Sequence, residues 1–360
     1  MRRIRVLIVD DAVVVRRLVT EALSADPLME VVGAAANGRI ALAKIPQVNP
    51  DLVVLDVEMP ELNGLETLRE IRKDYPRLPV IMFSTLTERG AATTLDALAL
   101  GANDYVTKPA NVGSVVAAIE RVRSELIPKA KALCGADAGG VSATHVEPRT
   151  LPRIGKPPVR PATPPPPVEV VAIGVSTGGP NALAQVIPQL PAGFPVPVLV
   201  VQHMPPIFTK LLAERLSAQA QMPVEEARFG ARPDAGTIWM APGDFHLVVR
   251  REGTRLSLQT HKGPFENSCR PAVDVLFRSV AEIYGAASLA VVMTGMGQDG
   301  LRGCEDIRGA GGQVVVQDEA SSVVWGMPGF VANAGLADKI LPLDQLPGEI
   351  VRRVEKGRRR

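Results

Sequence analysis

Short apolar runs alternate with helical patterns twice along this 360-residue chain, and this alternation constrains the fold more than any other feature of the sequence. A strand–helix–strand order places successive strands parallel, with helices on both faces of the sheet. We therefore expect an α/β protein. The first 125 residues predict a five-stranded parallel sheet with helices that include Val13–Ser24 and Val112–Leu126. The five expected strands are Arg5–Val9, Glu30–Ala35, Leu52–Leu55, Val80–Phe83 and Asp104–Val106.

The composition changes at the end of this first domain, which we place at residues 1–125. Residues 126–167 hold small residues followed by Pro157-Pro158 and Pro164–Pro167, and proline runs favour stiff polyproline II structure over a packed core. This segment is predicted to be a linker. At the other end of the chain, residues 355–360 are predicted to form a basic, solvated tail, with contact to an acidic partner as the alternative.

The alternation resumes at Val168, and residues 168–354 predict a second domain with a doubly wound, mainly parallel sheet. Four long apolar runs have the length of buried strands, and three shorter runs have the closer spacing of a hairpin. We therefore expect an antiparallel excursion beside the parallel strands. The long runs are Val168–Val175, Pro197–Gln202, Ser288–Thr294 and Gln313–Gln317, and the shorter ones are Gly236–Ala241, His246–Arg250 and Leu256–Thr260.

Composition argues against several classes of partner. The formal net charge is +2, so the bulk charge does not attract nucleic acid. No apolar stretch approaches the roughly 20 residues that span a bilayer, which predicts no direct membrane insertion. The three cysteines are widely spaced and lack a metal-ligand pattern, as in proteins of a reducing compartment. We expect a cytoplasmic protein.

Carboxylates gather where the expected strands of the first domain end. Asp10 and Asp11 follow the first strand and Asp56 follows the third, and the carboxyl ends of parallel strands line one crevice. Carboxylate oxygens are ligands that Mg²⁺ prefers. We expect Asp56 to accept a phosphoryl group and to contact the metal. Asp11 would ligate Mg²⁺, Asp10 would support it through bound water, and the Glu58 carbonyl would add a further ligand.

Two further residues complete this expected pocket. Lys108 would pair with the phosphoryl oxygens, and Ser84, at the end of its strand, would hydrogen-bond one of them. The alternative is that these acids and the lysine are ordinary loop charges. A single carboxylate at a strand end fits that alternative, whereas the full set at matching strand ends favours a phosphoacceptor pocket.

The first domain also holds several small motifs in a fixed order. They are Asp10-Asp11, Asp56, Met59-Pro60, Gly64, Ser84, Tyr105 and Thr107-Lys108-Pro109. On these positions, residues 4 to about 124 resemble a two-component receiver domain. The resemblance implies a flavodoxin-like fold, Mg²⁺ as the cofactor of phosphorylation and a histidine kinase as partner. It further implies that Ser84 and Tyr105 form a switch, in which the hydroxyl shifts toward the phosphoryl group as the ring repacks.

The second domain carries a serine at an expected strand-to-helix turn. The first long run leads into Ser176-Thr-Gly-Gly-Pro180, which places Ser176 at the carboxyl edge of the sheet and near the positive end of a helix. The letters fit the G-x-S-x-G elbow of α/β-hydrolases and approach a dinucleotide-binding fingerprint. The fingerprint needs an acid after the next strand. That strand is followed by His203 instead, so we expect no cofactor in this domain.

Three buried strands of the second domain are followed by Ser176, His203 and Asp299. In such a triad the imidazole takes the serine proton and the carboxylate orients the imidazole. The backbone N–H of Met296 and groups of Thr177 are the expected oxyanion donors. The alternative is a phosphate-binding loop with a structural histidine, and the order Ser–His–Asp differs from that of α/β-hydrolases. Of the other histidines, His145 lies in the predicted linker, and His246 and His261 are expected to be structural.

Six runs occur in order between residues 169 and 350. They are Ile173–Pro180, Gln202–Pro205, Ala241–Gly243, Arg270–Asp274, Thr294–Gly300 and Trp325–Pro328. On these runs the second domain resembles the catalytic domain of chemotaxis protein-glutamate methylesterases. The resemblance implies hydrolysis of γ-glutamyl methyl esters on methyl-accepting chemoreceptors, deamidation of receptor glutamines and recruitment to receptor arrays. It carries Ser176, His203 and Asp299 over as the triad, and Asp274 and Trp325–Pro328 as positions that shape the cleft.

Together the two resemblances imply a phosphorylation-regulated esterase. The unphosphorylated receiver would obstruct the cleft, and phosphorylation of Asp56 by the histidine kinase of a chemosensory array would open it. Two other functions stay open: the same chemistry on receptors of a non-chemotaxis signalling array, and a phosphorylation-dependent adaptor with a vestigial hydrolase domain. The intact Ser176, His203 and Asp299 argue against the adaptor.

Overall fold

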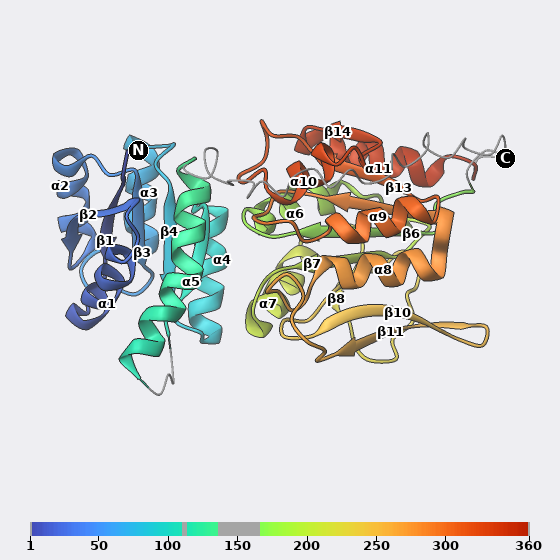
Figure 1. Cartoon of the computed structure of the whole chain (residues 1–360), viewed down its shortest axis with the longest axis horizontal. Helices are drawn as coiled ribbons and strands as arrows, with labels where there is room; N and C mark the ends of the chain where they lie inside the picture. The colour runs from blue at the N-terminus through green and yellow to red at the C-terminus, as the bar shows by residue number, and fades with distance from the viewer. Residues whose placement is uncertain (1, 110–113, 136–165, 359–360) are drawn as a thin grey trace, which may run out of the picture.

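A computed structural model describes residues 2–109, 114–135 and 166–358, which form two α/β domains side by side (Figure 1). Most of the predicted linker and His145 lie outside the described residues. No helix in the described segments is long and apolar enough to cross a lipid bilayer. The α/β class predicted from the alternation of runs is confirmed in both halves of the chain.

The first domain is a five-stranded parallel sheet of order β2-β1-β3-β4-β5. Its strands are nearly continuous runs of buried aliphatic side chains, as expected for a sheet that helices cover on both faces. The predicted five-stranded parallel sheet is therefore confirmed. The strands are β1 Ile4–Val9, β2 Met29–Ala35, β3 Leu52–Asp56, β4 Val80–Ser84 and β5 Asp104–Thr107, and the helices are α1 Val13–Ser24, α2 Gly38–Val48, α3 Gly64–Asp74, α4 Glu88–Ala99 and α5 Val115–Leu133.

The last helix of the first domain is longer than predicted. The sequence pattern predicts a helix that ends at Leu126, followed at once by the linker, but α5 continues to Leu133. The reason is that Leu126, Ile127 and Ala130 keep the apolar face of the helix buried, where α5 packs on α1. The linker therefore begins later than the composition of the chain indicated.

The second domain has a seven-stranded parallel sheet of order β14-β13-β12-β6-β7-β9-β8 and a separate antiparallel hairpin, β10-β11. This confirms the predicted combination of a mainly parallel sheet and an antiparallel hairpin. The strands are β6 Val170–Val175, β7 Val198–Gln202, β8 Val224–Glu226, β9 Ile238–Met240, β10 His246–Glu252, β11 Arg255–His261, β12 Ser288–Val292, β13 Gln313–Gln317 and β14 Lys339–Leu341. The helices are α6 Gly179–Val186, α7 Pro206–Ser217, α8 Val273–Tyr284, α9 Leu301–Gly309, α10 Met327–Asn333 and α11 Leu346–Glu355.

One strand that we predicted to be part of the hairpin lies in the parallel sheet instead. The run Gly236–Ala241 has the spacing of a hairpin strand, but it contributes β9, which pairs in parallel with β7 and β8. The side chains of Ile238 and Met240 are fully buried there. Two edge strands, β8 and β14, are absent from the sequence prediction because three residues are too few to show a period of two.

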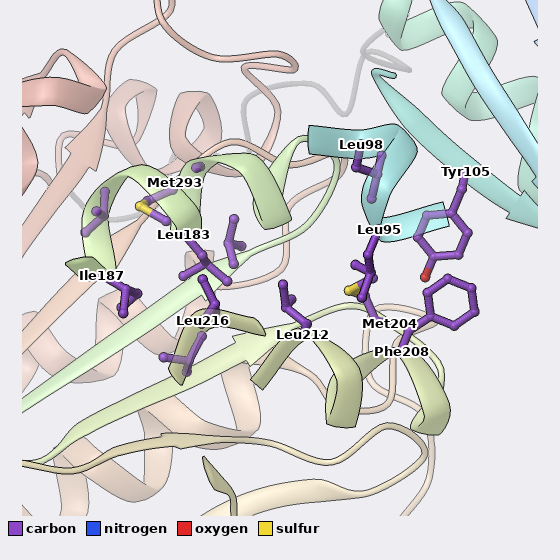
Figure 2. Close-up of a cluster of buried hydrophobic side chains, with 14 of the residues drawn as sticks. Leu95, Leu98, Tyr105, Leu183, Ile187, Met204, Phe208, Leu212, Leu216 and Met293 are labelled. Atoms are coloured by element: carbon purple, nitrogen blue, oxygen red, sulfur yellow. The ribbon is translucent and has the colours of Figure 1, made fainter. Parts of the chain in front are cut away.

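A continuous apolar seam joins the two domains (Figure 2). Helix α4 of the first domain packs on α6 and α7 of the second. Leu95 and Leu98 on α4 share one buried cluster with Phe208 and Leu212 on α7. The ring of Tyr105 stacks on Phe208, with centroids 4.5 Å apart and planes 9° from parallel. Buried apolar side chains therefore hold the two domains together, as they do in the core of a single domain.

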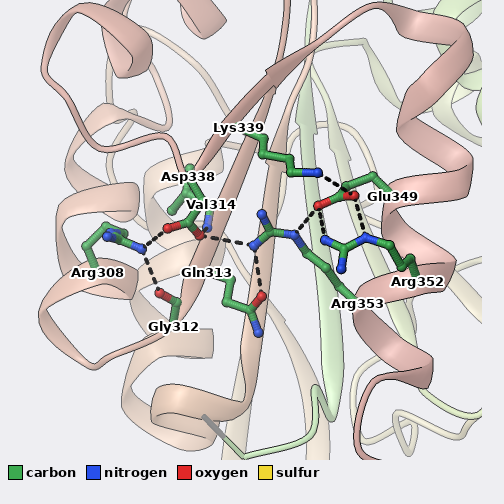
Figure 3. A network of polar contacts seen from close by, with 9 residues as sticks. All are labelled: Arg308, Gly312, Gln313, Val314, Asp338, Lys339, Glu349, Arg352 and Arg353. Carbon is green, nitrogen blue, oxygen red and sulfur yellow. Dashed lines mark hydrogen bonds and ion pairs between the residues drawn. The ribbon is translucent and has the colours of Figure 1, made fainter. Parts of the chain in front are cut away.

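A network of charges joins α11 to the edge of the second sheet (Figure 3). Arg353 is 7% exposed and bonds Glu349 on the same helix and Asp338 beside the sheet. Arg352 and Lys339 also donate to Glu349. The hydrogen bonds from Arg352, Arg353 and Lys339 outweigh the effect of burial and lower the pKa of Glu349 to about 2.

Replacement of Arg353 by alanine is expected to destabilise the chain by about 1.5–3 kcal/mol, because its buried hydrogen bonds to Glu349 and Asp338 are lost while other cations still pair with both acids. Arg352→Ala should cost less than about 1 kcal/mol, since its side chain is 53% exposed and two cations still pair with Glu349. Urea unfolding at neutral pH measures both losses of stability, and equal losses would contradict this account.

The contribution of Glu349 to the free energy of unfolding is complete above the unfolded-state pKa of 4.5, and it is lost as the pH falls toward 2.

The predicted basic tail is not wholly free in its described part. Arg358 donates to the carbonyl of Val168 at 2.6 Å and to the carbonyl of Val354 at 3.1 Å. These bonds attach the end of α11 to the start of the second domain. The described portion of the tail therefore contributes hydrogen bonds to the fold as well as positive charge.

Candidate active site

The predicted phosphoacceptor residues gather at the carboxyl edge of the first sheet. Asp10 directly follows β1, and Asp56 is the last residue of β3; both are almost fully buried. Lys108 Nζ lies 2.8 Å from Asp10 Oδ2 and 2.8 Å from Asp56 Oδ1. Oxygens of Asp10, Asp11 and Asp56 lie within 4.8 Å of one another. Such a cluster of carboxylate oxygens, with Asp11 exposed, fits a small divalent cation.

Burial is the main influence on Asp56. It raises the pKa of the carboxyl, the charge of Asp10 adds to the rise, and Lys108 opposes both, so the pKa stands at about 6. A cation beside these acids would stabilise their charged forms. Glu58 is exposed and its N–H lies 3.4 Å from Asp56 Oδ1, which keeps its peptide next to the acceptor.

Within the described residues, neither predicted switch residue is hydrogen-bonded to Asp56. Ser84, at the end of β4, donates its hydroxyl to the carbonyl of Gly90 at 3.1 Å and accepts from Thr94 Oγ1 at 2.7 Å. Tyr105 is buried against Phe208 of the second domain. In this arrangement, the Ser84 hydroxyl is hydrogen-bonded to α4, and the Tyr105 ring is stacked at the domain interface.

The three predicted triad residues follow adjacent strands of the second sheet. Ser176 comes directly after β6, His203 directly after β7, and Asp299 lies beyond β12 in the glycine-rich turn that opens α9. Because β12, β6 and β7 are neighbours, their carboxyl ends meet. His203 Nε2 lies 2.8 Å from Asp299 Oδ2, and the two side chains are 11% and 2% exposed.

Glycine makes the tight turn after Ser176 possible. Gly178 has a φ of 77°, a conformation that glycine adopts without steric cost. A Cβ on Gly179 would clash with the Gln202 side chain, so a larger residue fits only if Gln202 moves. Gln202 in turn donates from Nε2 to the carbonyl of Ser176 at 3.0 Å. The end of β7 therefore supports the backbone of the expected nucleophile.

The pair of His203 and Asp299 is strongly polarised. Burial opposes ionisation of Asp299, but the hydrogen bond to His203, its charge and backbone donors of α8 lower the pKa of this carboxyl. Burial would lower the pKa of His203, yet its contacts with Cys269 and Asp299 outweigh burial and raise the pKa. The bond to Asp299 therefore stabilises the imidazolium that forms when the histidine accepts a proton from a nucleophile.

Ser176 is close to this pair but not bonded to it. Within the described residues, the Ser176 hydroxyl makes no hydrogen bond, and its backbone N–H donates to the carbonyl of Thr294. His203 Nδ1 instead lies 3.6 Å from Cys269 Sγ. The structure therefore joins two of the three predicted triad residues directly and leaves the serine hydroxyl available.

The expected oxyanion donors are also available. Across the described parts of the chain, neither the backbone N–H of Thr177 nor that of Met296 donates to a protein acceptor. Gly326 and Met327 donate their N–H groups to the carbonyl of Gly295, which fixes the loop that carries Met296. The Trp325–Pro328 run, predicted to shape the cleft, thus supports this loop.

A cavity of about 460 Å³ lies between the domains at His203. Met204, Cys269 and Arg270 line it from the second domain, and Tyr105 and Lys129 from the first. Beside it, Thr177 Oγ1 donates to Asp104 Oδ2 at 2.7 Å across the interface, and both side chains are buried. The first domain thus borders the candidate site and bonds the neighbour of Ser176.

Sequence reasoning missed three residues of this site. Asp104 is the first residue of β5, and in the sequence it looks like an ordinary acid at the start of a strand. Cys269 has no partner at metal-ligand spacing in the sequence, and Asn267 carries no motif of its own. Both of the latter lie between Gly263-Pro264 and the Arg270–Asp274 run, a segment rich in turn-forming residues where periodicity gives no signal.

Family models and curated relatives match both halves of the chain. The model of the CheB methylesterase family matches residues 171–350, and that of the response regulator receiver domain matches residues 6–120. The chain is 58% identical over 360 residues to the protein-glutamate methylesterase/protein-glutamine glutaminase of Trichodesmium erythraeum, covering 98% of this chain and all of the relative. It is 52% identical to the protein of that name from Nocardioides sp., with 99% and 97% covered.

A solved structure agrees with these matches. The crystal structure of the Thermotoga maritima CheB methylesterase catalytic domain is 42% identical, with a TM-score of 0.51, and covers 51% of this chain and 98% of that one. Both resemblances seen in the sequence are thereby confirmed. The chain belongs to the CheB methylesterase family and carries a receiver domain ahead of the catalytic domain.

Proposed function

We propose that the chain hydrolyses γ-glutamyl methyl esters of chemoreceptors and deamidates receptor glutamines, under the control of phosphorylation at Asp56. The observation that carries this proposal is the buried bond between His203 and Asp299 beside Ser176. It occurs in a chain that aligns over its whole length with a protein-glutamate methylesterase/protein-glutamine glutaminase. Both activities use one acyl-transfer chemistry, since esters and amides pass through similar tetrahedral intermediates.

The roles of the site residues follow from their contacts. Ser176 Oγ attacks the acyl carbon, and His203 accepts its proton at Nδ1 because Nε2 is bonded to Asp299. The N–H groups of Thr177 and Met296 stabilise the oxyanion. The proton on Nδ1 passes to the departing methoxide or amide nitrogen, which leaves as methanol or ammonia. Water, deprotonated by His203, then cleaves the acyl-serine ester and restores a carboxylate.

In the receiver, Asp56 is the proposed acceptor of a phosphoryl group from the histidine kinase of a chemosensory array. Asp10, Asp11, Asp56 and the Glu58 carbonyl would hold Mg²⁺, which supplies the positive charge that phosphoryl transfer needs. Lys108, already between Asp10 and Asp56, would pair with the bound phosphoryl oxygens. We also propose that the chain acts at receptor arrays, where kinase and substrate occur together.

Regulation would act through the interface between the domains. When Ser84 turns toward a phosphorylated Asp56, it leaves its bonds to α4, and Tyr105 can move into the space behind it. That movement removes the stack on Phe208 and disturbs Asp104, which holds Thr177. The proposed units are residues 1–125 with the rest of α5, a linker to residue 167, the catalytic domain 168–354 and the basic tail 355–360.

Replacement of Asp104 by alanine is expected to raise the activity of the unphosphorylated chain by about tenfold. Loss of a buried hydrogen bond to a charged group costs the closed arrangement about 1.5 kcal/mol or more. Asp96→Ala is the matched control, because its ion pair with Arg215 crosses the same interface but is largely exposed; it should change basal activity less than about threefold. Unchanged basal activity in Asp104→Ala would contradict the proposed latch.

The experiment that tests the function is methanol release from methylated receptor membranes, with and without a small phosphodonor. The expected result is release that the phosphodonor increases. Release of ammonia from receptors with glutamine at the methylation sites tests the deamidase activity in the same preparation. No release from any receptor would overturn the substrate, and release that ignores the phosphodonor would overturn the switch.

A further inference from the structure

The segment between β11 and α8 is held firmly beside the catalytic pair. The buried ring of His246 contacts it at both ends: Nε2 lies 2.8 Å from the carbonyl of Pro264, and Nδ1 accepts from the N–H of Ala272 at 3.2 Å. Arg270 adds ion pairing to Asp244 and donates to the carbonyl of Gly263. A side chain on this segment therefore has a well-defined position relative to Asp299.

Asn267 is the residue of this segment that reaches Asp299. Its Nδ2 donates at 2.8 Å to Asp299 Oδ1 and at 2.8 Å to Asp274 Oδ2. The two protons of one amide nitrogen thus bridge two carboxylates that come from different elements. The residue has a φ of 51°, in the left-handed region that asparagine tolerates better than most residues. The residue as a whole is exposed, so the contact depends on the backbone conformation of the segment.

The position of Asp299 depends on few side chains. Oδ2 contacts His203 Nε2 and the N–H of Val273, while Oδ1 accepts from the N–H groups of Asp274 and Gly300 and from Asn267. Within the described residues, Asn267 is the one side chain besides His203 that bonds this carboxylate. In the part of the chain that the structure describes, it is also the one hydrogen-bond donor that Asp299 and Asp274 share.

Two buried carboxylates this close would repel each other without a shared donor. Burial and then the charge of Asp299 raise the pKa of Asp274, although it accepts from the N–H of Gly303. A donor placed between the two acids stabilises the charged form of both. Outer contacts that orient metal ligands are commonly worth roughly 10- to 100-fold in activity, and we expect an effect of this size for a contact that orients a catalytic carboxylate.

We propose that Asn267 is a positioning residue that holds the Asp299 carboxylate in the rotamer that orients His203, by bridging it to Asp274. The inference rests on the proposed function in one respect, namely that Asp299 orients the catalytic base. Asn267 does not touch the reacting atoms. It acts through Asp299, and its loss should therefore affect turnover and the acid–base behaviour of the pair more than substrate binding.

The test compares Asn267→Gly with Ser268→Gly in the full-length chain. Both residues are exposed and left-handed, with φ of 51° and 62°, so glycine preserves the backbone at each, but only Asn267 bonds Asp299. Asn267→Gly is expected to lower kcat for methanol release by roughly 10- to 100-fold with KM within about twofold, and Ser268→Gly should match wild type. Equal losses, or a kcat within twofold of wild type for Asn267→Gly, would overturn the proposal.

Two further readouts separate positioning from a structural role. The acid limb of the kcat/KM profile should move to higher pH in Asn267→Gly, because an Asp299 without this donor holds the shared proton more tightly. Other ionisable groups of the described residues near the pair are Asp274, Cys269, Glu266, Arg278 and Cys304, so the profile belongs to the cluster. Asn267→Asp keeps the shape but replaces the donor with a charge, and it should lose at least as much activity; wild-type turnover in that variant would refute the bridge.

A measurement without substrate keeps the result independent of the proposed function. The His203 Nε2 proton bonded to Asp299 should give a downfield proton resonance in wild type that shifts or broadens in Asn267→Gly and is unchanged in Ser268→Gly. If wild type releases no methanol, the proposed substrate fails while the resonance still decides the bridge. Calorimetry and phosphorylation of Asp56 report whether each variant is folded. An unshifted resonance in folded Asn267→Gly would overturn the inference.

Discussion

Replacement of Ser176 by alanine is expected to lower kcat for methanol release by roughly 10⁶-fold, the loss found when a triad serine is removed. The variant loses the atom that forms the acyl intermediate, while the bond between His203 and Asp299 stays in place. Initial rates on methylated receptor membranes measure the loss. Thermal unfolding should be nearly unchanged, because the Ser176 hydroxyl makes no hydrogen bond within the described residues.

Cys269→Ala is the informative companion to this variant. Cys269 Sγ lies 3.6 Å from His203 Nδ1, so a thiol as well as a hydroxyl is near the base. If Ser176 is the nucleophile, Cys269→Ala keeps most of the turnover and the acyl intermediate is trapped on Ser176. Loss of turnover in Cys269→Ala together with activity in Ser176→Ala would assign the nucleophile to the thiol instead.

Asp56→Asn is expected to abolish phosphorylation and with it the stimulation by phosphodonor. The asparagine cannot form the acyl phosphate, although it fits the space at the end of β3 and leaves Lys108 paired with Asp10. Phosphate incorporation and methanol release, each with and without phosphodonor, measure the two effects. Basal methanol release should stay near that of the unphosphorylated wild type.

The matched control for this variant is Asp51→Asn. Asp51 lies next to the start of β3, at the opposite end of the strand, where it pairs with Arg2. It should leave both phosphorylation and stimulation at wild-type values. Phosphate incorporation in Asp56→Asn at the stoichiometry of wild type would show that another residue is the acceptor.

The strand ends of the site could be predicted because buried parallel strands leave a strong trace in the sequence. The aliphatic runs that became β1, β3, β6, β7 and β12 are long enough to recognise, and the residues after them must meet at one edge. This is why Asp10 and Asp56, and likewise Ser176, His203 and Asp299, were expected together. The end of α5 was harder to predict, because packing on α1 extends the helix past the proline-containing turn.

The contacts that refine the site left no such trace. Asn267 and Cys269 lie on an irregular segment whose path depends on the buried ring of His246. The bond between Asp104 and Thr177 joins residues 73 positions apart in different domains. Contacts of this kind depend on three-dimensional packing and not on a local periodicity of residue types, so no pattern in the sequence predicts them.

The apolar seam of Leu95, Leu98, Phe208 and Leu212 would also make the proposed switch sensitive to temperature. Opening the interface would hydrate these side chains, and hydration of apolar surface increases the heat capacity. The free energy that separates the closed from the open arrangement then curves with temperature, and cooling weakens the apolar part of closure. A cell would consequently receive two inputs through one interface, the phosphorylation state of Asp56 and the temperature of its surroundings.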